Sequence, residues 1–199
     1  MNRYFCGCPH FRREGTIAMN RPFETAWEMS QYLLDGINRR VKKEDTLYIL
    51  GDIAFNFSDL SFFRQQIKCH CVCIRGNHDL KTPQLIDVFG RYNVHDTFTA
   101  KCCGEDIFLS HYPHFYWDDS HNNAFHGFSH VHSMRTETIE SIFPEIRAID
   151  CGFDEAKKRL GDYIPYHEQE IYGILSKRKG HDDVNFYIEK HVKYQKDKK

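Results

Sequence analysis

The sequence predicts an α/β protein, in which strands and helices alternate along the chain. Residues 46–50 and 69–74 are uninterrupted β-prone runs, typical of strands that are buried on both faces of a sheet. Between residues 23 and 41, apolar side chains recur close to helical spacing. The β-prone runs end in polar or glycine-containing turns, and α/β sheets build their sites at the carboxyl ends of strands.

The elements of the amino-terminal half begin with a short strand over residues 3–6, which is expected to stop at Gly7. Thr25 and Glu28 have the spacing of a capping box, so the first long helix is expected to start near Thr25. The further elements expected here are a strand at 46–50 that ends at Gly51-Asp52 and a short helix at 60–67.

The carboxyl-terminal half continues the pattern. The strand over 69–74 ends at Gly76-Asn77-His78-Asp79, and a strand over 106–110 ends at His111. Also expected are a strand-and-turn segment at 125–132, a strand at 144–149 and a helix at 167–179.

Length and composition indicate one globular domain over residues 1–180, followed by a charged tail over residues 181–199. The net charge of −1 does not indicate a nucleic-acid partner, and no stretch reaches the roughly 18 apolar residues of a membrane span. The amino terminus lacks the features of a secretory signal, so a cytoplasmic location is expected. In that reducing compartment the 8 cysteines are expected to be free thiols or metal ligands. The oligomeric state cannot be read from the sequence.

Side chains that can bind metals gather at the predicted strand ends. Histidine, aspartate and asparagine supply the nitrogen and oxygen donors that Zn, Fe and Mn prefer. A carboxylate such as that of Asp52 can bridge two cations, and such a centre activates water and binds phosphoryl oxygens. Each motif alone is weak evidence, because a single buried histidine is more often a core residue than a ligand. The candidate residues are Cys8, His10, Asp52, Asn77, His78, His111, His130 and His132.

Five blocks appear in a fixed order: Cys8-Pro9-His10, Gly51-Asp52, Gly76-Asn77-His78-Asp79, Ser110-His111-Tyr112-Pro113 and Ser129-His130-Val131-His132. This order resembles the calcineurin-like metallophosphoesterase family, particularly its small stand-alone bacterial and phage-type members. The family pattern is Asp-x-His, Gly-Asp, Gly-Asn-His-Asp/Glu, a lone His and Gly-His-x-His. The segments Arg21-Pro22-Phe23 and 148–154 are also similar to that subgroup, so the resemblance spans residues 4 to about 175.

The resemblance implies a four-layered α/β/β/α sandwich with a dinuclear metal centre at the sheet ends. One metal would be held by Cys8, His10, Asp52 and His132, and the other by Asp52, Asn77, His111 and His130. In the family pattern Asp52 bridges the two metals and His78 is the catalytic acid.

The last block can be aligned in two registers. Reading residues 127–130 as Gly-x-x-His would put Phe128 in a ligand position and leave one metal poorly held. The preferred register uses His130 and His132 and requires only a serine in place of glycine at position 129. His126 is then a loop residue near the site.

Cys8 stands where the family carries an aspartate. A thiolate there could bind metal, because a bound cation deprotonates a coordinating thiol and sulfur favours Zn or Fe over Mn. Alternatively, the site is degenerate and Cys8 is a small buried apolar residue. Cys69, Cys71 and Cys73 alternate along a strand and are expected to pack against a helix.

The function expected from these residues is hydrolysis of a phosphodiester or phosphomonoester by a dinuclear centre of Mn, Fe or Zn and metal-bound hydroxide. Diesters are slightly favoured, and the substrate would be a phosphoester small molecule or a nucleotide. Arg75 is the candidate substrate-binding residue. Arg12 and Arg13 also lie near motif loops and could contact a substrate phosphate, but a solvated role suits them at least as well. The alternative is a catalytically degenerate protein of the same fold that acts as a protein-interaction scaffold.

Overall fold

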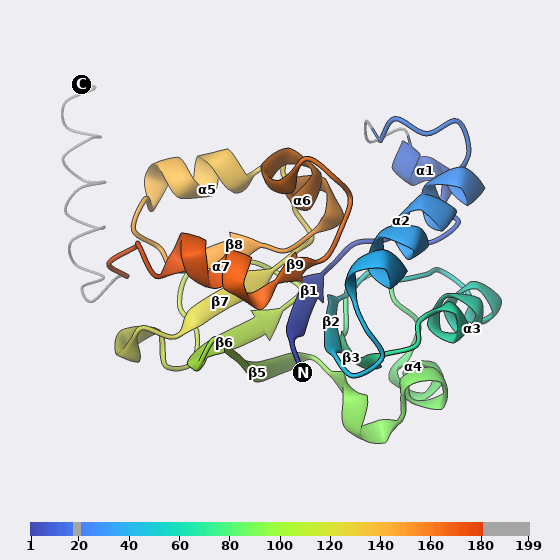
Figure 1. Ribbon diagram of the computed structural model, residues 1–199, viewed down its shortest axis with the longest axis horizontal. Helices are drawn as coiled ribbons and strands as arrows, with labels where there is room; N and C mark the ends of the chain where they lie inside the picture. The colour runs from blue at the N-terminus through green and yellow to red at the C-terminus, as the bar shows by residue number, and fades with distance from the viewer. Residues whose placement is uncertain (18–20, 181–199) are drawn as a thin grey trace.

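A computed structural model describes residues 1–17 and 21–180 of the chain (Figure 1). The expected charged tail at 181–199 lies outside the described residues. The strands are β1 (Arg3–Cys6), β2 (Thr46–Leu50), β3 (His70–Ile74), β4 (Val94–His95), β5 (Thr97–Cys102), β6 (Glu105–Ser110), β7 (Phe125–Phe128), β8 (Ala148–Asp150) and β9 (Tyr166–His167). The α-helices are α1 (Glu14–Ile17), α2 (Ala26–Arg40), α3 (Phe57–Gln66), α4 (Thr82–Phe89), α5 (Thr136–Ile142), α6 (Phe153–Leu160) and α7 (Glu168–Leu175).

The strands form two mixed sheets, which confirms the predicted α/β class. The first sheet has the order β4-β3-β2-β1-β9, in which β1 to β4 are parallel and β9 is antiparallel to β1. The second sheet has the order β5-β6-β7-β8, with an antiparallel β5-β6 hairpin and parallel pairing from β6 to β8. In both sheets, neighbouring parallel strands therefore end at a common edge, as the site prediction requires.

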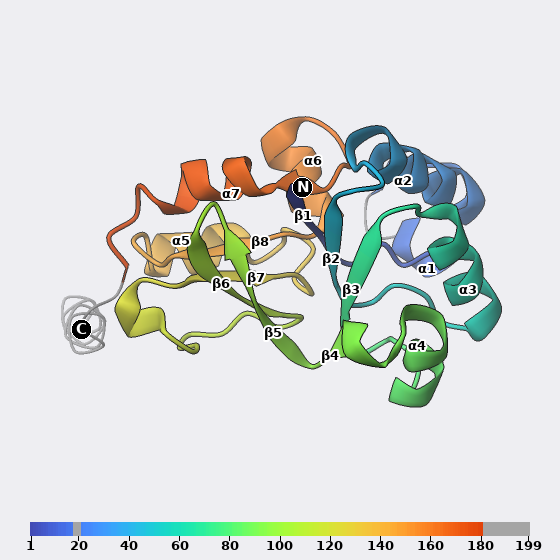
Figure 2. The same cartoon turned by 60° about the horizontal axis from the view of Figure 1, so that its bottom comes forward.

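Three apolar cores hold the layers together. Alternating side chains of β1, β2 and β3 face α2, α3 and α4 in the first core, and Cys69, Cys71 and Cys73 belong to it as predicted. The opposite face of the same strands, including Phe5 and Leu50, packs against residues of the second sheet and of α6 and α7. Figure 2 shows the second sheet on the side of the first sheet that is opposite α2, α3 and α4. The third core joins the other face of the second sheet to α5.

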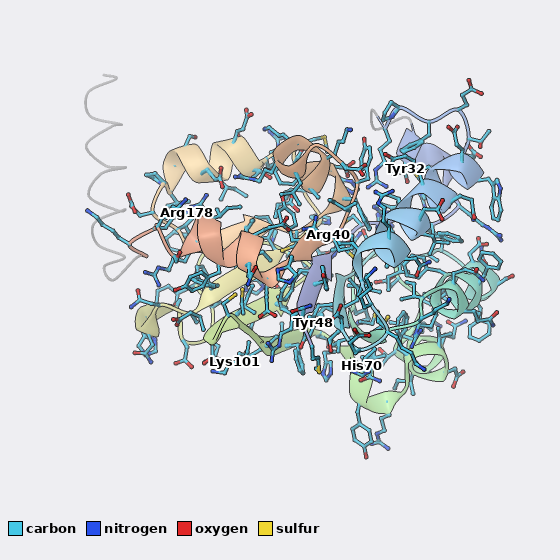
Figure 3. The ribbon with its side chains drawn as sticks, viewed as in Figure 1. Tyr32, Arg40, Tyr48, His70, Lys101 and Arg178 are labelled. Atoms are coloured by element: carbon cyan, nitrogen blue, oxygen red, sulfur yellow. The ribbon has the colours of Figure 1, made fainter. Side chains whose placement is uncertain are left out.

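Polar side chains connect elements that are distant in sequence, and several of them are labelled in Figure 3. The Tyr32 hydroxyl on α2 donates to Asp162 at 2.8 Å, and Arg40 forms an ion pair with Glu170 on α7. Arg178 donates to the Ala148 carbonyl of β8 at 3.0 Å. These contacts join α2 to the loop before β9 and to α7, and join the segment after α7 to β8.

The predicted elements are largely present, with shifted ends. The predicted start of the first long helix is confirmed, because the Thr25 side chain caps α2 by accepting from the Glu28 N–H. The Glu28 carboxylate accepts from Glu24 rather than from Thr25, so the capping box is only half formed. Helix α3 begins at Phe57 because Asn56 caps it there, earlier than the predicted residue 60. Among the described residues, no helix combines the length and apolar character needed to cross a membrane.

Candidate metal centre

Tight loops that follow β1, β2 and β3 of the first sheet, and β6 and β7 of the second, form the candidate site. Several residues in these loops adopt left-handed backbone, which costs free energy in residues other than glycine and is concentrated at functional sites. These residues are Cys8 (φ 52°), His10 (φ 47°), Asp52 (φ 55°), His130 (φ 67°) and His132 (φ 49°).

Two glycines allow the loops to converge. A Cβ atom on Gly76 would stand 2.3 Å from Asp52 Oδ1, and one on Gly51 would stand 2.6 Å from His111 Nδ1. Gly51 also has a φ of 81°, which disfavours a side chain there. The glycines that precede Asp52 and Asn77 in the sequence blocks are therefore required for the close packing of the loops.

Asp52 lies at the centre of the site and is almost fully buried. Its Oδ1 accepts a hydrogen bond from the His78 backbone N–H at 2.8 Å. Its Oδ2 lies 3.8 Å from His10 Nε2 and 3.4 Å from His111 Nε2. Burial by itself raises the pKa of Asp52, but the contacts with His111 and the His78 N–H outweigh it and lower the pKa to about 2. One oxygen of an ionised carboxylate thus lies close to a ring nitrogen of each of two histidines.

The first group of donor atoms surrounds His111. The His111 Nδ1–H donates to the Leu50 carbonyl at 2.8 Å, which leaves Nε2 free to act as a ligand when the ring is neutral. That Nε2 lies 3.0 Å from Asn77 Oδ1 and 3.1 Å from His130 Nδ1, in addition to Asp52. An N–H on His111 could satisfy only one of these neighbours well, whereas a cation can coordinate all of them.

The second group of donor atoms lies between His10 and His132. Their Nε2 atoms are 3.0 Å apart and their rings are stacked, with centroids 4.9 Å apart. The His132 Nδ1–H donates to Asp154 Oδ2 at 2.7 Å, which directs the unprotonated Nε2 toward His10. Burial, reinforced by the neighbouring His132, lowers the pKa of His10 to about 3. Two imidazoles whose Nε2 atoms face each other in this way are well suited to share a cation.

Cys8 is buried beside both groups. Its Sγ accepts from the His130 N–H at 3.2 Å and lies 3.5 Å from Ser129 Oγ. Among the described residues, two clusters have metal-ligand atoms that all lie within 4.8 Å of one another, and both contain Cys8: one with His10 and His132, the other with Asp52 and His111. Burial raises the pKa of the Cys8 thiol well above its usual range, so the thiolate needs a cation beside it.

Two supporting residues were not assigned a role from the sequence. The Arg21 side chain is 1% exposed and binds both carboxylate oxygens of Asp154, each at 2.8 Å. It also donates to the Cys8 carbonyl at 2.7 Å and to the Pro9 carbonyl at 3.1 Å. Arg21 and Asp154 therefore connect the loop of Cys8 and His10 to His132. The only sequence signal for them is that both lie in segments similar to the family.

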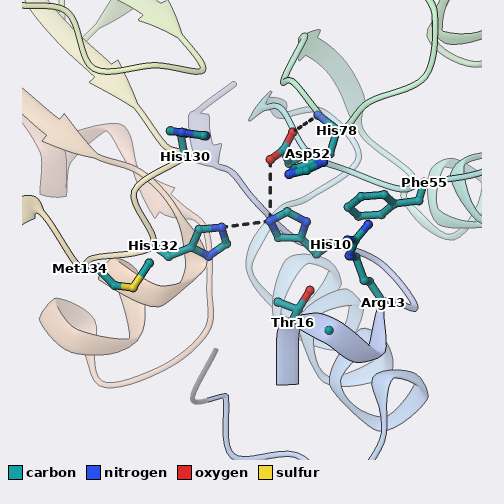
Figure 4. Close-up of a pocket in the computed structure, with 10 residues that line it drawn as sticks. His10, Arg13, Thr16, Asp52, Phe55, His78, His130, His132 and Met134 are labelled. Atoms are coloured by element: carbon teal, nitrogen blue, oxygen red, sulfur yellow. Dashed lines mark hydrogen bonds and ion pairs between the residues drawn. The ribbon is translucent and has the colours of Figure 1, made fainter. Parts of the chain in front are cut away.

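An open pocket of about 220 Å³ lies against the candidate metal ligands His10, Asp52, His130 and His132 (Figure 4). His78 is exposed there, with its ring 5.2 Å from Phe55 and 6.0 Å from His10, measured between centroids. The pocket is lined by His10, Arg13, Gly15, Thr16, Asp52, Phe55, His78, His130, His132 and Met134.

Other residues considered from the sequence lie away from this pocket. Arg75 forms an ion pair with Asp96 at 2.7 Å and does not line the pocket, so its role in substrate binding stays a prediction. His126, expected in a loop near the site, is instead buried in β7. Its Nδ1–H donates to the Phe108 carbonyl at 3.0 Å, and its Nε2 accepts from the His114 backbone N–H at 3.0 Å. Its neighbour Phe128 belongs to the third core, whereas His130 and His132 reach the site. Asp79 accepts three backbone N–H groups, those of Asp52, Ile53 and Gly76, and so joins its own loop to the loop after β2.

Comparisons with known proteins identify relatives of undefined function. No family model matches the chain. The uncharacterized protein MJ1445 of Methanocaldococcus jannaschii is 28% identical over 183 residues, which cover 88% of this chain and 92% of that protein. The crystal structure of AQ665 from Aquifex aeolicus, a protein of unknown function, has a TM-score of 0.68 at 23% identity and covers 87% of this chain and 98% of its own. The chain therefore shares the fold of AQ665.

A structure described as a novel archaeal phosphodiesterase is more distant. Its TM-score is 0.40 at 14% identity, over 65% of this chain and 74% of that chain. A likeness of this size does not establish a shared fold.

Proposed function

We propose that this protein is a metal-dependent phosphoesterase with a dinuclear centre bridged by Asp52. The observation that carries the proposal is the position of Asp52 Oδ2, between His111 Nε2 at 3.4 Å and His10 Nε2 at 3.8 Å. Each of these nitrogens belongs to its own group of inward-facing donors. A carboxylate shared by two such groups is typical of paired-metal phosphoesterase sites.

The residues present fit two transition metal ions. Cys8, His10, Asp52 and His132 would hold one ion, and Asp52, Asn77, His111 and His130 would hold the other. Cations bound at these positions would supply Lewis-acid stabilisation of phosphoryl oxygens and would activate water. Nitrogen and oxygen ligands suit Mn, Fe and Zn alike, and thiolate ligation by Cys8 favours Zn or Fe.

His78 is the candidate general acid. Its backbone N–H is fixed by Asp52 Oδ1, while its ring is exposed in the pocket beside Phe55. A histidine ring in this position can donate a proton to the leaving oxygen of a substrate bound against the ligands. The contact with Asp52 therefore holds the His78 backbone and so positions its ring in the pocket.

The order of the sequence blocks and the packing of two sheets between helices support membership in the calcineurin-like metallophosphoesterase family, with its four-layered α/β/β/α sandwich. The single domain over residues 1–180 is part of the same proposal. Phosphodiesters remain slightly favoured over phosphomonoesters, with a phosphoester small molecule or nucleotide as the substrate. The open pocket of about 220 Å³ is small, so it would hold the phosphoryl group and the atoms next to it.

The test is metal analysis of anaerobically purified protein, combined with hydrolysis of bis(p-nitrophenyl) phosphate. We expect transition metal in the purified protein and turnover that is lost on chelation and restored by Mn, Fe or Zn. The absence of both metal and turnover, with both restored by Cys8→Asp, would contradict the proposal for the native chain. That result would favour the degenerate scaffold.

A further inference from the structure

Arg13 differs from the other arginines around the centre. Arg12, Arg21 and Arg75 each form an ion pair with a carboxylate: Asp59, Asp154 and Asp96, respectively. Arg13 lines the pocket and is exposed, and within residues 1–17 and 21–180 it has no carboxylate partner. The pocket therefore contains a cationic side chain whose charge the described residues do not neutralise.

Phe55 holds this guanidinium in place. Arg13 Cζ lies 3.6 Å from the centroid of the Phe55 ring, which is the face-on contact of a cation–π pair. The Phe55 ring is in turn stacked on His10, with centroids 5.7 Å apart and an interplanar angle of 24°. Figure 4 shows Arg13, Phe55 and His10 along the same wall of the pocket. The position of the guanidinium is thus tied to a candidate metal ligand.

A guanidinium whose flat face is covered still presents its N–H edge. That edge matches the spacing of two phosphate oxygens and forms short, charge-assisted hydrogen bonds with them. Stacking on Phe55 also reduces the rotamer entropy that Arg13 would lose when it binds an anion.

We propose that Arg13, held against Phe55, binds an anionic phosphoryl oxygen of the substrate at this pocket. This inference rests on the proposed function and narrows its substrate class. The preferred substrates carry an anionic oxygen beyond those at the metal ligands, either on a terminal phosphate or on a phosphate next to the scissile diester.

The direct test measures the affinity of the metal-loaded, full-length protein for inorganic phosphate by calorimetry. We expect Arg13→Gln to weaken phosphate binding about tenfold or more and Phe55→Leu to weaken it less. Arg12→Gln is the matched control, because it removes the same charge from the adjacent residue, which is already paired with Asp59. Metal content and thermal unfolding of Arg13→Gln should match those of the wild type, since Arg13 is exposed.

Equal phosphate affinity in Arg13→Gln and wild type, an equal loss in Arg12→Gln, or no phosphate binding by the wild type would overturn the inference. Kinetic measurements distinguish a failure of this inference from a failure of the proposed function. Phosphate binding through Arg13 without hydrolysis of any ester would refute only the function. Hydrolysis with an unchanged KM in Arg13→Gln, for every ester below, would refute only the inference.

Three esters show which phosphate of the substrate Arg13 binds. A KM that rises about tenfold for p-nitrophenyl phosphate, with kcat little changed, assigns Arg13 to a terminal phosphate. A rise confined to a dinucleotide that carries a 5′-phosphate assigns it to a neighbouring phosphate. A rise for bis(p-nitrophenyl) phosphate alone, which has no additional anionic group, would contradict the proposed preference.

Discussion

The His132 Nδ1–H donates to Asp154 Oδ2 at 2.7 Å, and this contact fixes the ring nitrogen that faces the metal site. Arg21 holds Asp154 from the other side through two hydrogen bonds of 2.8 Å. Burial raises the pKa of Asp154, but its contacts with Arg21 and His132 hold the pKa well below the usual range. The carboxylate therefore stays ionised and fixes the His132 ring so that its Nε2 is directed at His10.

Asp154→Asn is expected to weaken metal binding about 10–100-fold, because a histidine ligand that loses its carboxylate partner also loses its fixed tautomer. The measurement is competition for metal with a chelator of known affinity. Asp162→Asn is the matched control, since Asp162 is paired with Tyr32 and Arg39 on the surface. Equal metal affinity in Asp154→Asn and wild type would contradict the positioning role.

Arg21→Met is expected to lower the free energy of unfolding by about 3 kcal/mol, because it leaves a partly buried carboxylate without its cation. It also removes the donors to the Cys8 and Pro9 carbonyls. Urea denaturation of metal-free protein measures this effect apart from metal binding. A loss no larger than that of the surface variant Arg39→Met would show that Arg21 contributes little to stability.

Cys8→Ser is expected to reduce metal affinity and to shift preference from Zn toward Mn, because it replaces a soft sulfur donor with a hydroxyl. Metal content after loading with an equimolar Zn and Mn mixture measures the shift. Cys103→Ser is the control, since Cys103 is an exposed cysteine in the β5-β6 turn. Unchanged metal content and preference in Cys8→Ser would show that the thiol is not a ligand.

Asp150 gives the fold a specific dependence on pH. It is fully buried, and burial raises its pKa to about 6 despite hydrogen bonds from the Gly152 and Ser133 N–H groups. The unfolded-state pKa is about 3.9, so folding favours the protonated form, and its stabilising effect is lost as pH rises through that interval.

Asp150→Asn removes this dependence. Between about pH 4 and pH 6.5 the wild type should lose about 2 kcal/mol of unfolding free energy relative to the variant. Urea denaturation of both proteins across this range measures the difference. A constant difference would contradict a raised pKa for Asp150.

Much of the candidate site was predicted from the sequence, because α/β sheets build their sites at the carboxyl ends of strands. Asp52, Asn77 and His111 each follow a strand that the β-prone runs had already indicated. Parallel pairing of β2 with β3 brings Asp52 and Asn77 to one edge of the first sheet, and His111 meets them from the end of β6 in the second sheet. The register that uses His130 and His132 was preferred because it supplies both ligands, whereas the other register would use Phe128. In the structure Phe128 lies in the third core.

The remaining features depend on contacts that local patterns do not encode. Arg21 and Asp154 are 133 residues apart, and no periodicity links two such side chains before the chain is folded. The Arg13–Phe55 stack arises only because the loops after β1 and β2 lie side by side. Helices α4 and α6, of 8 residues each, were not predicted from the sequence.

The most direct test of the central claim, that Asp52 bridges two metal ions, is electron paramagnetic resonance of the Mn-loaded protein. Two Mn ions about 3.5–4 Å apart on a shared carboxylate should give an exchange-coupled spectrum. In Asp52→Asn this spectrum should be lost, together with hydrolysis of bis(p-nitrophenyl) phosphate. Only isolated-ion signals in the wild type, at full metal loading, or a coupled spectrum that persists in Asp52→Asn, would contradict the account.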